Sequence, residues 1–398
     1  MPNTQRLYYN APETRSFEAT VLRVEPRGEH TSVWLDQTAF YPTSGGQPFD
    51  TGVLGSARVV GVEEDEQGDV VHLVGLGAPT VGTAVHGAID WVRRFDHMQQ
   101  HTGQHVLSAV LERTFGARTV GFHLGSESST IDLDRELTPA QLAQAEGEAS
   151  RIVWSDVPVT IRYASEEEAR QLPLRKEPAR TGTLRLIEIE GADLSACGGT
   201  HVGRTGAIGQ VAVASWERFK GGQRVEFLCG GRSLRRFRDL RDASAASIRL
   251  LSVLPGELPD AIARLQAELK EQKRLLTAAQ ADLAKYEAAA LAASAEALPT
   301  ARAVLQIVDG DAGRLKALAS ALAAHDRIVA VHVSRATPAL AVAARGADVT
   351  VSCQELIGGL LKAFGGRGGG KPDLAQCGGL NAAPEAIVSA ARAFLLQS

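Results

Sequence analysis

The chain has 398 residues, which is too long for one hydrophobic core and predicts roughly two to four domains. Hydrophobic residues make up 44% and charged residues 22%, as in ordinary globular proteins, and the net charge of −4 excludes a general electrostatic attraction to nucleic acid. Any contact with nucleic acid must therefore come from a local basic patch.

The cysteines Cys197, Cys229, Cys353 and Cys377 are spread widely along the chain, which argues against a disulfide framework. No basic-then-apolar segment opens the sequence, and no apolar run reaches the ~18 residues that a membrane span needs. We therefore expect a cytoplasmic protein with reduced thiols and no membrane partner.

Residues 1–92 alternate apolar and polar side chains in short runs such as "EATVLRVE" and "TSVWLDQTAF", separated by turn residues. This pattern predicts a small, barrel-like β domain. A helix is then expected from Asp96, a good N-cap, to Gly116, a plausible C-cap. Strand-like pieces and a helix near 138–154 follow, so residues 93–242 are expected to form an α+β domain on an antiparallel sheet.

Apolar residues then recur with an unbroken 4-3 spacing, which is typical of a coiled-coil seam, although one buried core helix would explain part of it. The seam positions are Leu258, Ile262, Leu265, Leu269, Gln272, Leu276, Ala279, Leu283, Tyr286 and Ala290. We expect a helical coiled-coil stalk over residues 243–298. Residues 299–398 alternate strands with helices near 311–324 and 384–396, which predicts an α/β domain and completes an α+β multidomain chain.

Two short motifs carry candidate metal ligands. "HTGQH" places His101 and His105 four residues apart, on one face of the predicted helix, with a rise of about 6 Å between them. "CGGTH" places Cys197 and His201 four apart on a glycine-rich turn. Neither pair is decisive alone, but three imidazoles and a thiolate together predict zinc. His97 lies too far along the helix to join and is expected to cap the helix or support a ligand.

These motifs resemble those of a known family. "HTGQH" followed by "CGGTHV" is similar to the editing domain of alanyl-tRNA synthetase and of its freestanding relatives, the AlaX proteins. "LDQTAFYPTSGGQPFDTG" (35–52) resembles the glycine-rich motif that precedes this domain, and "GGRGGGKPDLAQCGG" (365–379) resembles the signature loop of the synthetase's C-terminal domain, called C-Ala. The three motifs stand in the family's order and span nearly the whole chain.

The resemblance implies a long-form AlaX protein, which hydrolyses alanine tRNA mischarged with serine or glycine and holds one zinc ion. The aminoacylation core of the synthetase precedes these motifs and has no room here, so we expect no amino-acid activation and no use of ATP. Editing of another mischarged tRNA, such as Ser-tRNA(Thr), stays open, because the threonyl synthetase carries similar motifs. A zinc-stabilised tRNA-binding module without activity is a second alternative.

The resemblance also implies roles for individual residues. His101, His105, Cys197 and His201 become the zinc ligands. The pocket candidates are Thr102, Gln104, His123 and Asp193, with Asp193 expected to orient a ligand histidine. Many synthetases have "HTATH", so Gln104 departs from that form. Ordinary helix surface, a structural strand histidine and a turn-forming aspartate are the competing interpretations of these residues. Four protein ligands describe a closed site, which favours substrate positioning over water activation by zinc.

Two segments are candidates for tRNA contact. Residues 218–241 hold eight cations against two anions, and the glycine loop near residue 370 lacks the Ser or Thr of a phosphate-binding Walker loop but carries two cations. The candidates are Arg218, Lys220, Arg224, Arg235, Arg236, Gly366, Arg367, Gly368, Gly369, Gly370, Lys371, Asp373 and Gln376. Solvated helix surface and a disordered linker are the alternatives. A homodimer through the stalk or the C-terminal domain is a further hypothesis.

Overall fold

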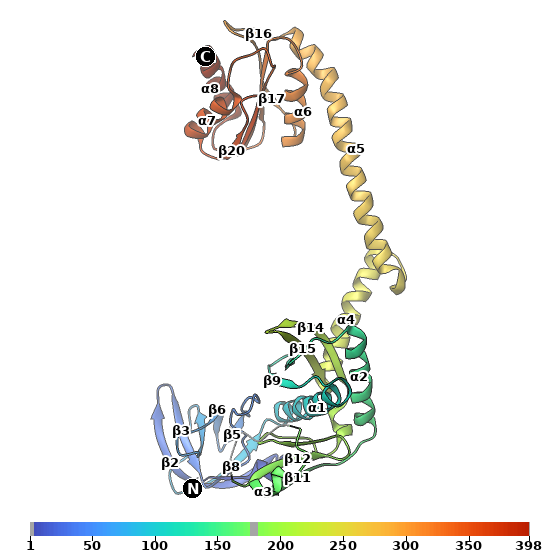
Figure 1. The fold of residues 1–398 in the computed structure, drawn as a ribbon. Helices are drawn as coiled ribbons and strands as arrows, with labels where there is room; N and C mark the ends of the chain where they lie inside the picture. The colour runs from blue at the N-terminus through green and yellow to red at the C-terminus, as the bar shows by residue number, and fades with distance from the viewer. Residues whose placement is uncertain (1–3, 176–181, 398) are drawn as a thin grey trace. The chain divides into compact units, whose positions relative to one another are not determined.

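The structure, a computed structural model, describes residues 4–175 and 182–397 (Figure 1). The chain divides into two compact units, Met1–Ala246 and Ser247–Ser398. The α+β multidomain prediction is confirmed, except for the coiled coil. Within the described residues, no helix is long and apolar enough to cross a bilayer.

The first unit begins with a closed six-stranded barrel, as predicted. Its strands in spatial order are β2 (Ser16–Arg27), β3 (His30–Leu35), β7 (Val70–Val74), β6 (Ala57–Glu64), β5 (Gly52–Leu54) and β8 (Ala84–Ile89). Along β2, Phe17, Ala19 and Val21 are buried while their neighbours are exposed, which is the period-two pattern of a strand with one face in a core. Before the barrel, β1 (Gln5–Arg6) pairs with β4 (Gln37–Thr38) and leads into the short helix η1 (Leu7–Tyr9).

Helix α1 (Trp91–Phe115) is central to this unit, because residues 97–111 are all buried. It ends at Gly116 as predicted, but the predicted start at Asp96 is wrong. Asp90, directly after the last barrel strand, caps the helix by accepting from the Arg93 N–H at 3.2 Å. Asp96 instead forms an ion pair with Arg232, 2.6 Å apart, and His97 lies inside the helix and not at its start.

Two antiparallel sheets pack with α1 and α2 (Pro139–Trp154). One has the order β14 (Val211–Phe219), β15 (Gly222–Cys229), β10 (Ser129–Leu133), β9 (Thr119–Leu124). The other has the order β11 (Val159–Ala164), β12 (Leu184–Ile189), β13 (Asp193–Ala196). A short helix α3 (Glu166–Arg170) and the turn η2 (Thr205–Ile208) complete the region. The prediction of an α+β region on an antiparallel sheet is confirmed.

The predicted coiled-coil stalk is not what the structure shows. Helix α4 (Gly230–Leu251) is followed by η3 (Pro255–Glu257) and a 36-residue helix α5 (Leu258–Ala293). The C-terminal part of α5 packs on α6 (Ala312–Leu322) through Ala284, Ala288 and Ala292, whose small side chains form part of that core. The residues of the predicted 4-3 seam are different from these three alanines and are largely exposed. No described helix pairs with the seam.

The second unit carries a mixed six-stranded sheet. Its order is β16 (Glu296–Ala297), β17 (Arg302–Val308), β18 (Ile328–Ser334), β19 (Ala339–Arg345), β21 (Leu374–Leu380), β20 (Arg367–Gly370). Helix α6 covers one face, and α7 (Cys353–Phe364) and α8 (Pro384–Gln397) cover the other. The predicted α/β alternation is confirmed, but sequence reasoning missed α7 and the hairpin β20–β21. The glycine run is thus an edge strand, where an added Cβ at Gly368 would lie 2.3 Å from the Gln376 carbonyl.

Candidate metal centre and pocket

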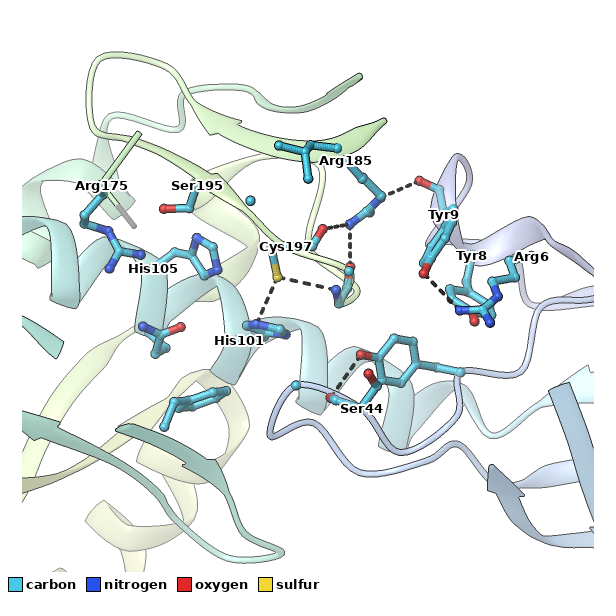
Figure 2. Close-up of a pocket in the computed structure, with 18 of the residues that line it drawn as sticks. Arg6, Tyr8, Tyr9, Ser44, His101, His105, Arg175, Arg185, Ser195 and Cys197 are labelled. Atoms are coloured by element: carbon cyan, nitrogen blue, oxygen red, sulfur yellow. Dashed lines mark hydrogen bonds between the residues drawn. The ribbon is translucent and has the colours of Figure 1, made fainter. Parts of the chain in front are cut away.

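A pocket of about 620 Å³ lies within the first unit. One side comes from the segment before the barrel and from the glycine-rich loop, including Tyr8, Tyr9 and Ser44. The other side comes from α1 and from the chain around β12 and β13, including His101 and Cys197 (Figure 2). A cavity of this size accommodates a small organic ligand or the end of a larger one.

The four predicted ligands lie together beside this pocket, and His101, His105 and Cys197 line it. Their ligating atoms all lie within 4.8 Å of one another. The Cys197 Sγ is 3.4 Å from the Nε2 of His101 and 3.3 Å from that of His201. Tetrahedral zinc with bonds of about 2.0–2.3 Å would separate such atoms by about 3.5 Å. The four side chains therefore fit a zinc-type ion.

Each histidine is held from behind through its Nδ1 atom. His101 Nδ1 lies 2.8 Å from Gln47 Oε1, and His105 Nδ1 lies 2.7 Å from Asp193 Oδ2. His201 Nδ1 lies 3.2 Å from the Thr102 hydroxyl, which itself donates to the Met98 carbonyl. An Nδ1–H held in this way leaves Nε2 as the lone-pair atom, which is the arrangement that orients a histidine toward a metal.

Asp193 has the supporting position predicted for it. Besides His105, it accepts hydrogen bonds from Arg175 Nε at 2.6 Å and from the Ser195 hydroxyl at 3.0 Å. Burial would raise the pKa of Asp193, but His105 and Arg175 outweigh burial and hold this pKa below its usual value. The residue is therefore a carboxylate at neutral pH.

The Cys197 thiol and the His201 imidazole also favour the ligating forms. At His105, burial lowers the pKa, but Asp193 and Cys197 outweigh burial and raise the pKa to about 9. Burial alone would raise the pKa of the Cys197 thiol, but His101 and His201 outweigh it and hold the pKa well below its usual value. Burial lowers the pKa of His201 to about 3, with a further contribution from His101. A thiolate and a neutral imidazole are the protonation states that a metal requires.

In both motifs, a glycine is required at one position because any larger side chain would clash with a neighbour. A Cβ on Gly199 would lie 2.1 Å from Cε1 of His101, so only glycine lets the "CGGTH" turn approach the helix. A Cβ on Gly103, between the two helical ligands, would lie 2.2 Å from the Sγ of Cys229. The close approach at Gly199 brings the two motifs together, and Gly103 lets α1 pack closely against β15.

The remaining pocket candidates divide into two groups. Gln104 lines the pocket, and its amide donates to the Ser108 hydroxyl at 2.8 Å. Thr102 is fully buried behind the ligands, where it contacts His201 and not the cavity. His123 is exposed on β9 and does not line the pocket, although its neighbour Phe122 does. Neither Thr102 nor His123 lines the pocket, so a catalytic role for either residue stays a prediction.

His97 does not play the part expected of it. It is buried in α1, outside the four-residue cluster, and its Nδ1 has no hydrogen-bond partner among the described residues. Burial, with Arg93 and Arg232 nearby, lowers the pKa of His97 to about 3. It is neither a helix cap nor a partner of a ligand.

Sequence reasoning missed two features of the site. Gln47 lies within the quoted glycine-rich motif, and besides His101 it donates to the Thr200 hydroxyl at 2.8 Å, so it ties the barrel to the ligand turn. Arg185 donates hydrogen bonds to the carbonyls of Cys197 at 2.6 Å and Gly199 at 3.0 Å, and to the Tyr9 carbonyl at 2.9 Å. No local sequence motif around Arg185 predicts that its side chain lies between these segments.

Comparisons with known proteins agree with these observations. The family description "tRNA synthetases class II (A)" matches residues 9–93, "Threonyl and Alanyl tRNA synthetase second additional domain" matches residues 184–226, and "DHHA1 domain" matches residues 300–397. The alanyl-tRNA editing protein AlaX-L of Pyrococcus horikoshii is 29% identical over 399 residues, which cover 97% of each chain. The chain is similar to this alanyl-tRNA editing protein over nearly its whole length.

The AlaX relationship extends to full synthetases. The alanine–tRNA ligase of Pyrococcus abyssi is 33% identical over 94% of this chain, and that of Methanoculleus marisnigri is 36% identical over 96%. The chain spans 42% of the length of each of these two ligases. Among solved structures, the C-Ala domain of Aquifex aeolicus alanyl-tRNA synthetase matches 26% of this chain and 97% of that chain, at 23% identity and a TM-score of 0.24.

The basic segment at residues 218–241 is partly neutralised by nearby carboxylates. Arg218 pairs with Glu136 at 2.9 Å, and Arg224 pairs with Asp132 at 2.7 Å. Lys220 lies over the Phe219 ring on the hairpin between β14 and β15. On α4, Arg235 lies 3.9 Å from the carboxylate of Asp96, and Arg236 is exposed one residue further on. The excess of cations in this stretch is therefore smaller in the fold than in the sequence.

The C-terminal candidates gather on the hairpin β20–β21. A small pocket of about 200 Å³ is lined in part by Arg367, Gly368, Gly369 and Gln376. Gly366 precedes β20 with a φ of +95°, Gly370 ends it, and Lys371 and Asp373 lie in its turn. The candidates are thus on one ordered edge of the sheet and not on a disordered linker. Cys377 is buried there, and burial raises the pKa of its thiol to about 11, so a reactive or metal-binding role has no support.

Proposed function

We propose that the protein is a trans-editing hydrolase, which deacylates alanine tRNA mischarged with serine, and with glycine as a second substrate. The observation that carries the proposal is the cluster of His101, His105, Cys197 and His201, the first three of which line a pocket large enough for an aminoacyl group and its ribose. The relationship to an alanyl-tRNA editing protein over the whole chain supports the same activity. A charged tRNA substrate places this activity in the cytoplasm, with no need for ATP.

The proposed site holds one zinc ion on these four side chains. Zinc, when bound, would fix the amino acid in the pocket and polarise its ester. Four protein ligands favour the positioning role. The chain's own part is to keep the imidazoles oriented through Gln47, Asp193 and Thr102, and to present Gln104 to the bound amino acid.

The alternatives from the sequence differ in measurable ways. Editing of Ser-tRNA(Thr) stays open because the matched description of residues 184–226 names both threonyl and alanyl synthetases. A zinc-stabilised tRNA-binding module would bind tRNA and zinc without cleaving an ester.

The deciding experiment is release of labelled amino acid from Ser-tRNA(Ala), Gly-tRNA(Ala), Ala-tRNA(Ala) and Ser-tRNA(Thr). We expect fast release from the first, slow release from Ala-tRNA(Ala), and loss of activity in Cys197→Ala. Cys353→Ala, which removes a buried thiol from the other unit, is the matched control and should stay active. A zinc-loaded, folded protein that cleaves none of the four esters would contradict the proposal, and cleavage of Ser-tRNA(Thr) alone would favour the first alternative.

We also propose that the glycine hairpin contacts tRNA together with five cations, Arg218, Lys220, Arg224, Arg235 and Arg236. We propose further that two copies pair along the exposed 4-3 seam of α5. Leu269 is 68% and Leu276 58% exposed on that seam, which is unusual for leucines at regular heptad spacing. Sedimentation at micromolar concentration tests the pairing. A dimer that dissociates in Leu269→Lys supports it, and a wild-type monomer overturns it.

A further inference from the structure

A second group of side chains lines the same pocket beside the metal ligands. The chain has five tyrosines, and four of them, Tyr8, Tyr9, Tyr41 and Tyr163, line this one cavity. The rings of Tyr8 and Tyr9 lie edge to face with their centroids 5.1 Å apart. Such an aromatic wall is unexplained by a pocket that holds only a small polar amino acid such as serine.

Two polar atoms in this wall lack partners. The Tyr8 hydroxyl and the Nη2 atom of Arg185 have no hydrogen-bond partner among the described residues, although Tyr8 is fully buried and Arg185 is only 8% exposed. A buried donor without a partner is costly and is rare in folded proteins. Both atoms therefore indicate a ligand that supplies the missing partners.

Arg185 is also a buried cation without a carboxylate. Among the described residues, Arg94, Arg185 and Arg232 are the buried arginines; Arg94 pairs with Asp50 and Arg232 with Asp96. Arg185 donates only to backbone carbonyls and forms no ion pair with any described carboxylate. Burying a charge without an oppositely charged partner is costly. An anionic ligand would offset that cost.

The two cations beside Tyr9 complete the arrangement. The guanidinium carbons of Arg6 and Arg185 both lie 5.4 Å from the centroid of the Tyr9 ring. Figure 2 shows Tyr8 and Tyr9 next to each other, with Arg185 hydrogen-bonded to the Tyr9 carbonyl. Arg6 is paired with Glu64, whereas Arg185 has no carboxylate partner among the described residues. Aromatic faces next to arginine are how proteins hold an unpaired nucleotide.

We propose that Tyr8, Tyr9 and Arg185 form a subsite for the 3′-terminal nucleotide of the aminoacyl-tRNA, with a phosphate oxygen on Arg185 and the nucleoside against the tyrosines. This inference rests on the proposed function, because it assigns the part of the substrate next to the ester. Arg185 also donates to the carbonyls of Cys197 and Gly199, so the nucleotide and the metal turn contact the same side chain.

The test is equilibrium binding of two stable probes to the full chain. One is the trinucleotide CCA carrying serine through a 3′-amide, and the other is the same seryl-amide on adenosine without phosphate. Tyr8→Phe removes only the unpartnered hydroxyl and should weaken both probes about fivefold without loss of stability. Arg185→Lys should weaken the trinucleotide about tenfold and the nucleoside little. Arg113→Lys, which changes an exposed arginine of α1 outside the pocket, is the matched control and should bind as the wild type.

The outcomes separate this inference from the proposed function. Wild-type affinity in both Tyr8→Phe and Arg185→Lys, with serine release intact in the wild type, would overturn the subsite and leave the activity standing. Unchanged probe affinity with loss of serine release in Arg185→Lys would also overturn it, since Arg185 would then act on the reacting carbonyl. Tight probe binding that depends on both residues, in a protein that releases no serine, would support the subsite and contradict the hydrolase.

Discussion

The Nδ1 atom of His105 lies 2.7 Å from the Oδ2 atom of Asp193. The Asp193 side chain is fully buried and also forms an ion pair with Arg175. The carboxylate fixes the ring so that Nε2 faces Cys197. His105 is thus oriented by a residue 88 positions away in the chain.

Asp193→Asn should therefore weaken metal binding. The neutral amide keeps the shape but loses the charge that supports His105, and changes of this kind typically cost about 10–100-fold in metal affinity. Competition with a chromophoric chelator measures the zinc dissociation constant. Asp132→Asn, which breaks a carboxylate–arginine pair outside the pocket, should keep the wild-type zinc affinity. Equal zinc affinity in Asp193→Asn and the wild type would contradict the supporting role.

Adjacent glycines in the ligand turn should respond differently to alanine. Gly199→Ala would place a methyl group 2.1 Å from the His101 ring, so the ring or the turn must move and zinc binding should be lost. Gly198→Ala meets only the Tyr9 hydroxyl, at 3.8 Å, and should bind zinc normally. Metal content by mass spectrometry after gel filtration distinguishes the two. Full zinc occupancy in Gly199→Ala would show that the turn is looser than the structure indicates.

A second glycine pair tests packing in the helices. Gly103→Ala should destabilise the first unit by roughly 1–3 kcal/mol or more, because its methyl would lie 2.2 Å from the Cys229 sulfur in a buried helix. Gly147→Ala in α2 meets nothing within 4 Å and should stabilise by about 0.5–1 kcal/mol, since alanine favours the helix. Urea unfolding should therefore show that the two substitutions change the free energy of unfolding in opposite directions.

Tryptophan fluorescence is a suitable signal for that experiment. All four tryptophans, at positions 34, 91, 154 and 216, belong to the first unit, so the signal is not mixed with unfolding of the second. A free energy of unfolding for Gly103→Ala equal to that of the wild type would contradict the predicted clash.

The second unit should lose stability in mild acid through His332. This side chain is buried in β18, and neither ring nitrogen has a partner among the described residues. Burial lowers the pKa of His332 from 6.5 to about 4. The unfolded chain therefore binds the proton first, and stability present above pH 6.5 is lost as the pH falls toward 4, by up to about 3 kcal/mol.

Hydrogen exchange of the β18 amides at pH 7 and pH 5 measures this effect, because the second unit has no tryptophan. His332→Leu should remove most of the pH dependence of the opening free energy. His325→Leu, which removes a less buried histidine from the same unit, should retain it. The same dependence in His332→Leu and the wild type would assign the acid sensitivity elsewhere.

Short-range patterns predicted the parts of the molecule that depend on local geometry. His101 and His105 share a helix face because of their four-residue spacing, and Cys197 and His201 share a tight turn, so the ligand set was visible in the sequence. Tyr8 and Arg185 were not, because Arg185 reaches the segment before the barrel across 176 positions. No period or motif encodes a contact of that length.

Errors in the predicted fold also have physical reasons. Asp90 and Asp96 are equally good caps by residue type, and only the end of the barrel strand decides that the helix begins at the first. The 4-3 spacing of α5 describes a face that suits a partner, but it does not show that one is present. The glycine run resembles a loop by composition, yet its missing side chains are what allow β20 to lie against β21.

The burial of Arg94 against Asp50 bears on how the first unit can be divided. Both side chains are fully buried, and Arg94 donates to Asp50 at 2.9 Å and to the Pro12 carbonyl at 2.7 Å. A fragment cut at residue 93 would keep every metal ligand, yet it would leave this guanidinium without its carboxylate and His101 without Gln47. A fragment that preserves these contacts around the metal centre therefore has to include the barrel.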